Sequence, residues 1–348
     1  MWFVSVEGYL MNYDCITYET KIIVPSNLEE LRFEQVIDEM IAINNNLYFV
    51  GQHGNLLYEY DMVENYCNCY VIPRTEYIAW GCFSGVYLFQ QYIYLFARTI
   101  GTVFRFDTVN KEFINLWAEK KGIAMRSCRM GDKVFLYGEK IACYDMISGQ
   151  FEQEYSIGEG SILYLTKCGE VFYYLTKNRF SVWNLVGNSK VSMYEEKCDV
   201  EKYGIFFLTK HKVFVLPSES KDILILNRQS GALLYDNPPD DMVYVEKGWS
   251  KYWGYTEDDR YIWCANRVCN YVLCIDKESE GIKWIKLKLP ELKEEIPYLE
   301  LKMKLANKTF FSECEMPVEQ FMLCIKKQEL TNCESNSYGK RIWEMLEE

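Results

Sequence analysis

The feature that most constrains this chain is a short motif that recurs seven times along its 348 residues. In each copy a run of apolar and aromatic residues ends at an Asp or Asn, a few polar residues follow, and a second run begins. The copies lie 38 to 49 residues apart and are anchored at Asp14, Asp61, Asp107, Asp145, Asn184, Asn227 and Asp276. A chain made of one repeated unit is expected to fold as a stack or ring of these units around a shared core.

The residues on either side of the motif indicate β-strands. The residue before each anchor is large and apolar, as in Tyr60 and Phe106, and the residue four places before it is also apolar, as in Leu57 and Val103. These two positions lie on opposite faces of a strand, and a strand that is apolar on both faces packs between two neighbours. The Asp or Asn accepts hydrogen bonds from the amides that follow it and so opens a turn.

Further strands precede the anchored one in each unit. Another aromatic-rich run lies upstream, such as VFVL at 213–216, and a turn such as Lys210-His211 separates it from an earlier run, such as GIFFL at 204–208. Each unit is therefore predicted to contain four short antiparallel strands, here called A to D in chain order. Seven such units predict an all-β, seven-bladed β-propeller.

The two ends of the chain are predicted to meet in one blade. The first copy begins directly at strand B, at residues 2–6, so its strand A has to come from the other end, either from 298–305 or from 307–315. Such pairing removes an open sheet edge. We expect a single propeller domain over residues 1–315, followed by short amphipathic helices in a packed tail over 316–348.

The motif resembles those of known propellers. The segments CYDMISGQFEQEY (143–155) and LNRQSGALLYD (226–236) are similar to quinoprotein-like repeats, and the general pattern resembles kelch repeats of uncharacterised bacterial propellers. The paired glycines of kelch repeats are missing, and so is the WD dipeptide. The resemblance implies a binding or scaffold role and identifies no ligand.

The composition and the N-terminal sequence limit the cellular locations and the classes of binding partner that we expect. The net charge of −12 argues against nucleic-acid binding. The N-terminal residues lack the basic region of a signal peptide, no apolar run is long enough for a membrane span, and the 14 cysteines are scattered along a long chain. We therefore expect reduced thiols, a cytoplasmic location and no membrane partner.

The sequence offers little catalytic chemistry. It has no nucleophile elbow, phosphate-binding loop or zinc-protease motif. The two histidines, His53 and His211, are predicted to lie on opposite faces of the ring, so they cannot share a metal. Cys264 and Cys269 flank a tight loop, either as a neutral thiol pair or as a redox pair. We expect no metal and no cofactor.

One face of the predicted ring gathers residues suited to binding. The A–B and C–D turns emerge on one face, and the B–C and D–A loops emerge on the other. The second face is predicted to hold His53, Arg98 and Arg267 from B–C loops and Trp80, Arg126, Trp249 and Trp253 from D–A loops. Trp and Arg dominate binding energies at interfaces, although each tryptophan is also explained by packing between blades.

These features favour a non-catalytic module that presents the B–C/D–A face to a protein or peptide. The alternative is a protein that binds a saccharide or an anionic metabolite in the central channel, with or without catalysis. A quinone-dependent oxidoreductase is disfavoured because the sequence shows no cofactor cage.

Overall fold

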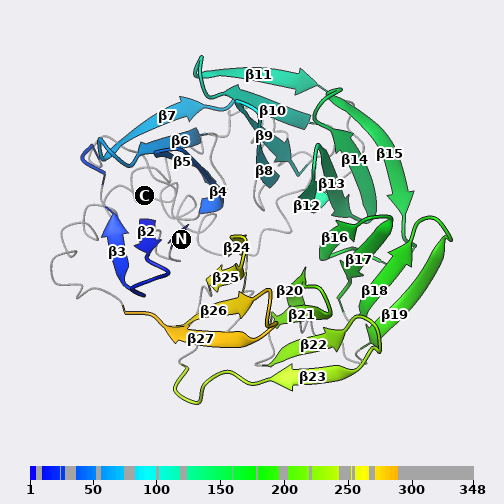
Figure 1. Cartoon of the computed structure of the whole chain (residues 1–348). Coiled ribbons are helices and arrows are strands. Elements are labelled where there is room, and N and C mark those ends of the chain that lie inside the picture. The colour runs from blue at the N-terminus through cyan, green and yellow to red at the C-terminus, as the bar shows by residue number, and fades with distance from the viewer. Residues whose placement is uncertain are drawn as a thin grey trace, which may run out of the picture.

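The structure of the chain is a computed structural model. The structure describes residues 1–4, 10–23, 25–27, 37–51, 56–73, 83–98, 102–117, 124–158, 160–177, 179–195, 203–218, 222–242, 252, 255–265 and 271–288. Every regular element within these ranges is a β-strand, and the strands form antiparallel sheets arranged in a ring as a β-propeller (Figure 1).

Six of the sheets are four-stranded blades whose strands follow one another in chain order from the axis outward (Figure 1). The first two comprise β4 (Ile37–Ile43), β5 (Asn46–Gly51), β6 (Leu56–Asp61) and β7 (Tyr66–Val71), and β8 (Phe83–Phe89), β9 (Tyr92–Ala97), β10 (Thr102–Asp107) and β11 (Glu112–Trp117). The next two comprise β12 (Ala124–Met130), β13 (Lys133–Gly138), β14 (Lys140–Asp145) and β15 (Gln150–Ser156), and β16 (Tyr164–Cys168), β17 (Val171–Leu175), β18 (Arg179–Asn184) and β19 (Ser189–Glu195). The last two comprise β20 (Tyr203–Leu208), β21 (Lys212–Pro217), β22 (Ile223–Asn227) and β23 (Leu233–Asp236), and β24 (Thr256–Glu257), β25 (Tyr261–Ala265), β26 (Tyr271–Asp276) and β27 (Ile282–Lys286).

The remaining sheet has three strands, in the order β1 (Trp2–Val4), β2 (Leu10–Tyr13) and β3 (Thr20–Ile23). The prediction of seven four-stranded blades is therefore met in part, because the described residues form six. The strand expected to complete the first sheet, at 298–305 or 307–315, and the helices expected within 316–348 lie outside the described residues.

The Asp or Asn anchor shapes every C–D turn as the sequence predicts. In the turn after β14, Asp145 Oδ1 accepts hydrogen bonds from the amides of Ile147 and Ser148, both at 2.8 Å. The same pair of bonds forms at all seven anchors. One side-chain oxygen thus satisfies two turn amides in each unit, which explains why this position is Asp or Asn.

The fourth residue after every anchor closes the turn in the left-handed conformation. Its φ is positive in all seven turns, at Tyr18, Asn65, Lys111, Gly149, Asn188, Gly231 and Glu280. Gly and Asn tolerate this conformation, whereas other residues lose about 1 kcal/mol in it. Tyr18, Lys111 and Glu280 therefore adopt a backbone conformation that is locally unfavourable for these residues.

These three residues all contact the preceding sheet of the ring. Lys111, in the turn after β10, forms an ion pair with Glu59 of β6. Glu280, after β26, accepts a hydrogen bond of 2.7 Å from the amide of His211, between β20 and β21. The hydroxyl of Tyr18, after β2, lies 2.6 Å from Lys283 Nζ of β27. Contacts between blades thus accompany each of the costly turn residues.

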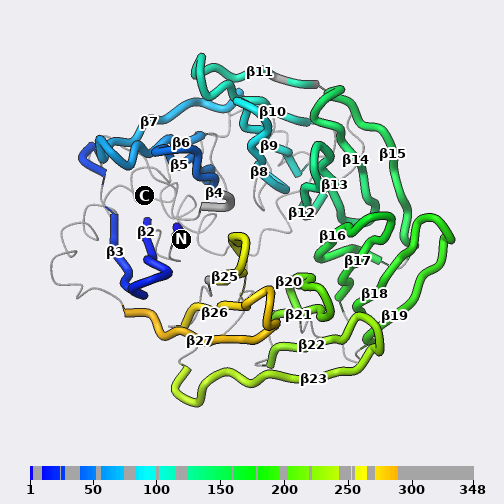
Figure 2. Tube along the Cα trace, in the orientation of Figure 1, coloured from blue at the N-terminus to red at the C-terminus, as the bar shows by residue number. Residues whose placement is uncertain are grey.

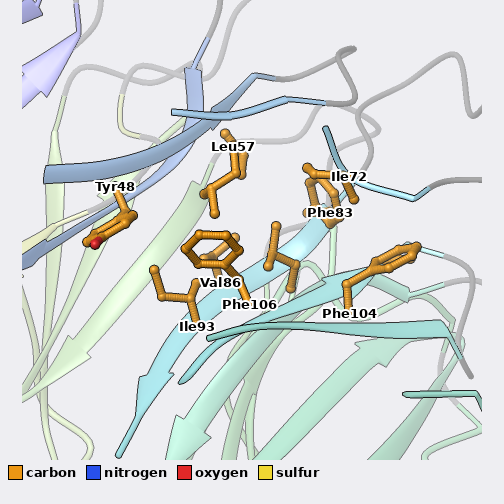
Figure 3. Packing of buried hydrophobic residues seen from close by; sticks show 11 residues of the cluster. Tyr48, Leu57, Ile72, Phe83, Val86, Ile93, Phe104 and Phe106 are labelled. Atoms are coloured by element: carbon orange, nitrogen blue, oxygen red, sulfur yellow. The ribbon is translucent and has the colours of Figure 1, made fainter. Parts of the chain in front are cut away.

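The core lies between blades rather than within a single sheet. Figure 3 shows Tyr48 and Leu57 of one blade packed against Ile93 and Phe106 of the next, and all four are buried. Val103 lies on the other face of the same strand as Phe106 and packs into the following cluster. The prediction that each anchored strand is apolar on both faces is confirmed.

The three-stranded sheet packs against blades on both sides. Leu10 and Met11 belong to the cluster that contains Phe49 of the β4–β7 blade, whereas Tyr13 packs with Trp263 of the β24–β27 blade. The ring centroids of Tyr13 and Trp263 are 6.4 Å apart. The ring of sheets therefore closes through this N-terminal sheet, and Figure 2 shows β2 and β3 between β7 and β27.

Candidate functional site

The turns and loops of the ring divide into two faces. In every four-stranded blade, the first amide after the anchor donates a hydrogen bond to a carbonyl in the A–B turn of the same blade. These bonds join Met62 to Asn45, Thr108 to Gln91, Met146 to Asp132, Leu185 to Glu170, Arg228 to His211 and Lys277 to Arg260. The A–B and C–D turns thus form one face, called here the turn face, and the opposite ends of the strands form the loop face.

Two of the predicted site residues lie together on the loop face. Arg98 directly follows β9, and its carbonyl accepts a hydrogen bond of 2.7 Å from the amide of Ala124, the first residue of β12. Arg126 lies two residues further along β12, and both arginines are half-buried. The other predicted residues lie outside the described ranges: His53, Trp80, Trp249, Trp253 and Arg267.

Arg98 has unused hydrogen-bonding capacity in the described structure. Its Nε is buried and has no hydrogen-bond partner among the described residues. A buried N–H without an acceptor costs free energy. The other N–H groups of a guanidinium can donate to carboxylate or phosphate oxygens.

Three tyrosines extend this region toward the axis of the ring. Tyr137 lies at the loop-face end of β13, Tyr164 begins β16, and Tyr255 directly precedes β24. The ring centroids of Tyr137 and Tyr164 are 6.4 Å apart, and Tyr255 is close enough to Tyr164 to raise the pKa of its phenol. Tyr164 lies on β16 and Tyr255 directly precedes β24, the innermost strands of their blades, whereas Tyr137 lies on β13, the second strand of its blade. Sequence reasoning missed the tyrosines, because among 28 Tyr nothing marks the few at the inner ends of strands.

The phenols of this cluster sit in a desolvated environment. Burial raises the pKa of Tyr137, Tyr164 and Tyr255 above the ordinary value, so all three stay neutral at physiological pH. Arg126 acts in the opposite direction on Tyr137 by favouring the phenolate. Tyr255 nevertheless exposes 42% of its surface, so part of the cluster is open to solvent. An arginine beside neutral phenols offers a cation that can pair with an anion and aromatic faces that can contact an apolar group.

The described residues contain no group of three or more metal-ligating side chains. His211 is an exposed A–B turn residue, as predicted. The eight cysteines in the described ranges are all free thiols, and Cys264 is buried. Its proposed partner, Cys269, lies outside those ranges.

The turn face carries a feature that sequence reasoning missed. In five consecutive sheets, the second residue after the anchor is a β-branched aliphatic residue whose exposed fraction lies between 68% and 89%. We call this set the aliphatic arc, and it consists of Ile16, Val63, Val109, Ile147 and Val186. The signal was present in the aligned repeats, at the position two after each anchor.

The described part of the chain contains no helix that is long and apolar enough to cross a membrane.

Comparison with known proteins gives no family. No protein-family model matches the chain, and no curated protein matches it. Many solved structures match by shape. The computationally designed Ika8 protein has 9% identity and a TM-score of 0.51, with 84% of this chain and 87% of that chain covered.

Two natural proteins show the same level of likeness. U3-55K has 7% identity and a TM-score of 0.54, over 75% of this chain and 84% of that chain. PorZ, a surface component of the type-IX secretion system of Porphyromonas gingivalis, has 11% identity and a TM-score of 0.51 over 72% of this chain, which spans 33% of PorZ. At these identities the likeness shows the fold alone. The chain therefore shares its fold with these proteins, and no match identifies it as a kelch or quinoprotein-like member.

Proposed function

We propose that this protein is a non-catalytic recognition module that presents its loop face to a protein or peptide partner. The observation that supports the proposal is that the backbone at Arg98, after β9, is hydrogen-bonded to Ala124 of the next blade, two residues before Arg126, so two arginines lie on neighbouring segments of the loop face. Arginine forms bidentate bonds with carboxylates, and it is prominent among residues that dominate interface energies.

The expected partner chemistry is an acidic side chain or a C-terminal carboxylate next to apolar groups. The carboxylate would pair with the guanidinium groups, while the faces of Tyr164 and Tyr255 would contact the apolar part. Trp80, Trp249 and Trp253 belong to the same proposed face, together with Arg267 and His53.

A second candidate function is the binding of a small anionic ligand or saccharide in the centre of the ring. The partly open tyrosine cluster beside Arg126 supports it, because aromatic faces stack on sugar rings and arginine pairs with anions. A ligand present at about 100 times its Kd stabilises the folded state by about 2.7 kcal/mol.

The test compares the variant Arg98→Ala/Arg126→Ala with Arg179→Ala. Arg179 begins β18 and pairs with Glu195 of the outer strand β19, away from Arg98 and Arg126. Tagged proteins would be used to capture partners from a lysate of the source cells, with quantification by mass spectrometry. The double variant is expected to lose a captured protein at least tenfold, whereas Arg179→Ala retains it.

Capture that is unchanged in the double variant would contradict the recognition site. The small-ligand function would replace the recognition function if two results were found together. Capture of every protein would be independent of the two arginines. One compound from a panel of saccharides and carboxylic or phosphorylated metabolites would raise the melting temperature of the unmodified protein but not of the double variant.

We also propose that the three-stranded sheet is the seventh blade of a kelch-like propeller, completed by a strand from 298–305 or 307–315. Its support is that this sheet packs against blades on both sides. The amides of β1 that point away from β2, toward the axis, are then expected to be protected in hydrogen exchange, and rapid exchange there would contradict the pairing. We also propose a cytoplasmic location, and its support is that the eight cysteines within the described residues are free thiols, as expected in a reducing compartment.

A further inference from the structure

We propose that the interface between the β8–β11 and β12–β15 blades binds a short carboxylate at the turn face, where its oxygens accept hydrogen bonds from Tyr144 and Arg105. The site lies beside Gly149, in the turn that follows β14. This inference does not depend on the proposed recognition site, which lies on the opposite face of the ring.

Two other C–D turns show which chemical group fits at this position. In the turn after β6, the hydroxyl of Tyr60 donates a hydrogen bond of 2.8 Å to Asn65 Oδ1. In the turn after β18, Trp183 Nε1 donates a hydrogen bond of 3.1 Å to Asn188 Oδ1. In both turns a buried donor just before the anchor thus meets a side-chain carbonyl oxygen from the fourth residue after it.

The turn after β14 has the donor but not the acceptor. The equivalent residues are Tyr144 and Gly149, and glycine has no side chain to supply an oxygen. Tyr144 is 1% exposed, and its hydroxyl has no hydrogen-bond partner among the described residues. A Cβ placed on Gly149 would lie 3.7 Å from this hydroxyl, and no other atom of the described residues outside 148–150 would lie within 4 Å of it. The space that an Asn side chain fills in the turns after β6 and β18 is therefore open here.

The preceding blade brings a positive charge to the same place. Arg105 of β10 shares a strand face with Val103, which packs in one cluster with Tyr144, and it lies directly opposite Tyr94 of β9. The hydroxyl of Tyr94 reaches the turn after β14, where it donates a hydrogen bond of 3.4 Å to the carbonyl of Met146. Burial raises the pKa of the Tyr144 phenol, and Arg105 is close enough to act in the opposite direction.

Arg105 has hydrogen-bonding capacity to offer. Its guanidinium carbon lies 4.4 Å from the centroid of the Tyr92 ring. The N–H groups lie in the plane of the guanidinium, so stacking on an aromatic face leaves them available to an acceptor. The Nε of Arg105 is buried and has no hydrogen-bond partner among the described residues. Two unpartnered donors, one of them cationic, therefore face the same interface between blades.

These two donors define the class of ligand. The group that Asn supplies in the other turns is a methylene joined to a carbonyl, and acetate has nearly the same shape with a negative charge. One carboxylate oxygen would accept the hydrogen bond from Tyr144, and the other would pair with the guanidinium of Arg105. Burial raises the pKa of Tyr144 to about 12, so its hydroxyl keeps the proton and remains a donor at neutral pH.

The surroundings limit the affinity of the site. Hydrogen bonds from the turn amides hold the pKa of Asp145 below its ordinary value, so this carboxylate stays ionised next to Tyr144 and repels a second anion. A ligand as small as acetate also has few atoms with which to gain binding energy. We therefore expect a dissociation constant for acetate on the order of 1 mM.

The test measures acetate binding to the full chain at pH 7 by saturation-transfer NMR of the acetate methyl group, with sodium chloride holding the ionic strength constant. Acetamide is the matched ligand, because it has nearly the same shape without the charge. Acetate is expected to bind at least tenfold more tightly than acetamide, because only acetate forms a charge-assisted bond with Arg105. In Arg105→Gln the two ligands are expected to bind with similar affinity.

A side chain placed in the open space provides the second arm. Gly149→Asn is expected to weaken acetate binding at least tenfold, because its own oxygen would accept the hydrogen bond from Tyr144. The matched control is Gly231→Asn. Gly231 has the same φ of 69°, but the residue before its anchor is Leu226, which has no hydroxyl. Asn tolerates this conformation, so both variants are expected to fold, and the control is expected to bind acetate as the unmodified protein does.

Three results would overturn the proposal. The unmodified protein gives no saturable signal with acetate, which would show that water alone satisfies the two donors. Acetate and acetamide bind the unmodified protein equally, or Gly149→Asn binds acetate as tightly as Gly231→Asn does.

The variant Arg98→Ala/Arg126→Ala separates this site from the recognition site. It is expected to leave acetate binding unchanged. Loss of acetate binding in this double variant, with no loss in Arg105→Gln, would place the carboxylate on the loop face and contradict the proposed site.

Discussion

At the scale of single residues, the clearest stabilising contact between two blades is made by a buried carboxylate. Glu59 of β6 is 3% exposed. Its oxygens accept hydrogen bonds from Tyr48 at 2.5 Å, Tyr70 at 2.6 Å and Asn46 at 2.9 Å, and from Lys111 of the next blade. A buried charge is tolerated only when it is paired and fully hydrogen-bonded, and this one is.

The sequence could not reveal this network. Glu59 occupies a strand position that reads as an ordinary exposed residue, and Lys111 is 52 residues away in the chain. Their encounter depends on the packing of two blades. By contrast, the anchors Asp14 to Asp276 could be identified because each bonds to amides two and three residues further on.

The variant Glu59→Gln is expected to lower the free energy of unfolding by about 1–3 kcal/mol, because it removes the charge that Lys111 pairs with and leaves a phenol hydroxyl without its acceptor. Urea unfolding at neutral pH measures the change. The matched control is Glu154→Gln on the outer strand β15, where an exposed ion pair with Lys140 contributes little. A change at Glu59 no larger than the change at Glu154 would contradict the role of the network.

The pH dependence of the same variant tests the direction in which the pKa of Glu59 is shifted. Burial alone would raise the pKa of Glu59, but the hydrogen bonds from Lys111, Tyr48 and Tyr70 outweigh it and hold the pKa below its ordinary value. The network therefore contributes stability above the unfolded pKa of about 4.3, and this is lost as pH falls through the lower folded pKa. The stability difference between wild type and Glu59→Gln is expected to shrink below about pH 4. A difference that grows on acidification would show the opposite shift.

At the scale of elements, one turn design serves all seven units. Gly or Asn at the left-handed position, as at Gly149 and Gly231, is a signal that can be read from the sequence, because these residues tolerate a positive φ. The sequence cannot reveal Tyr18, Lys111 and Glu280 at this position, because local preference disfavours them and they are accompanied by contacts with the preceding sheet. Strand positions were predicted well for the same reason that turns were: both depend on neighbours along the chain.

Gly231→Ala tests the left-handed position without steric interference. Gly231 has a φ of 69°, and no atom lies within 4 Å of the site that a Cβ would occupy. The substitution is expected to lower the free energy of unfolding by about 1–2 kcal/mol through backbone strain alone.

Two further variants serve as comparisons for the stability of Gly231→Ala. Gly231→Asn is expected to cost less than the alanine, because Asn tolerates the conformation. Gly187→Ala, in another C–D turn where the backbone does not require a positive φ, is expected to be nearly neutral. Equal losses at both glycines would show that the turn does not impose the conformation.

At the scale of the whole molecule, repetition made the architecture predictable and the site hard to predict. Seven spaced anchors were enough to indicate a ring of antiparallel sheets, and the structure shows six complete blades and a three-stranded sheet. The repeat marks what the units share, whereas binding residues are those that differ between units. Loop topology was enough to place Arg98 and Arg126 on the loop face, whereas the tyrosine cluster and the aliphatic arc could be seen only from coordinates and exposures.

The central claim is that the ring closes through the N-terminal sheet, which brings Tyr18 to Lys283 although 265 residues separate them. The most direct measurement replaces Tyr18 with the photo-crosslinking residue p-benzoylphenylalanine and maps the products by peptide mass spectrometry. The closed ring predicts an intramolecular cross-link from the peptide containing residue 18 to the peptide containing 282–286. Cross-links confined to residues 1–72, or formed only between chains, would contradict it.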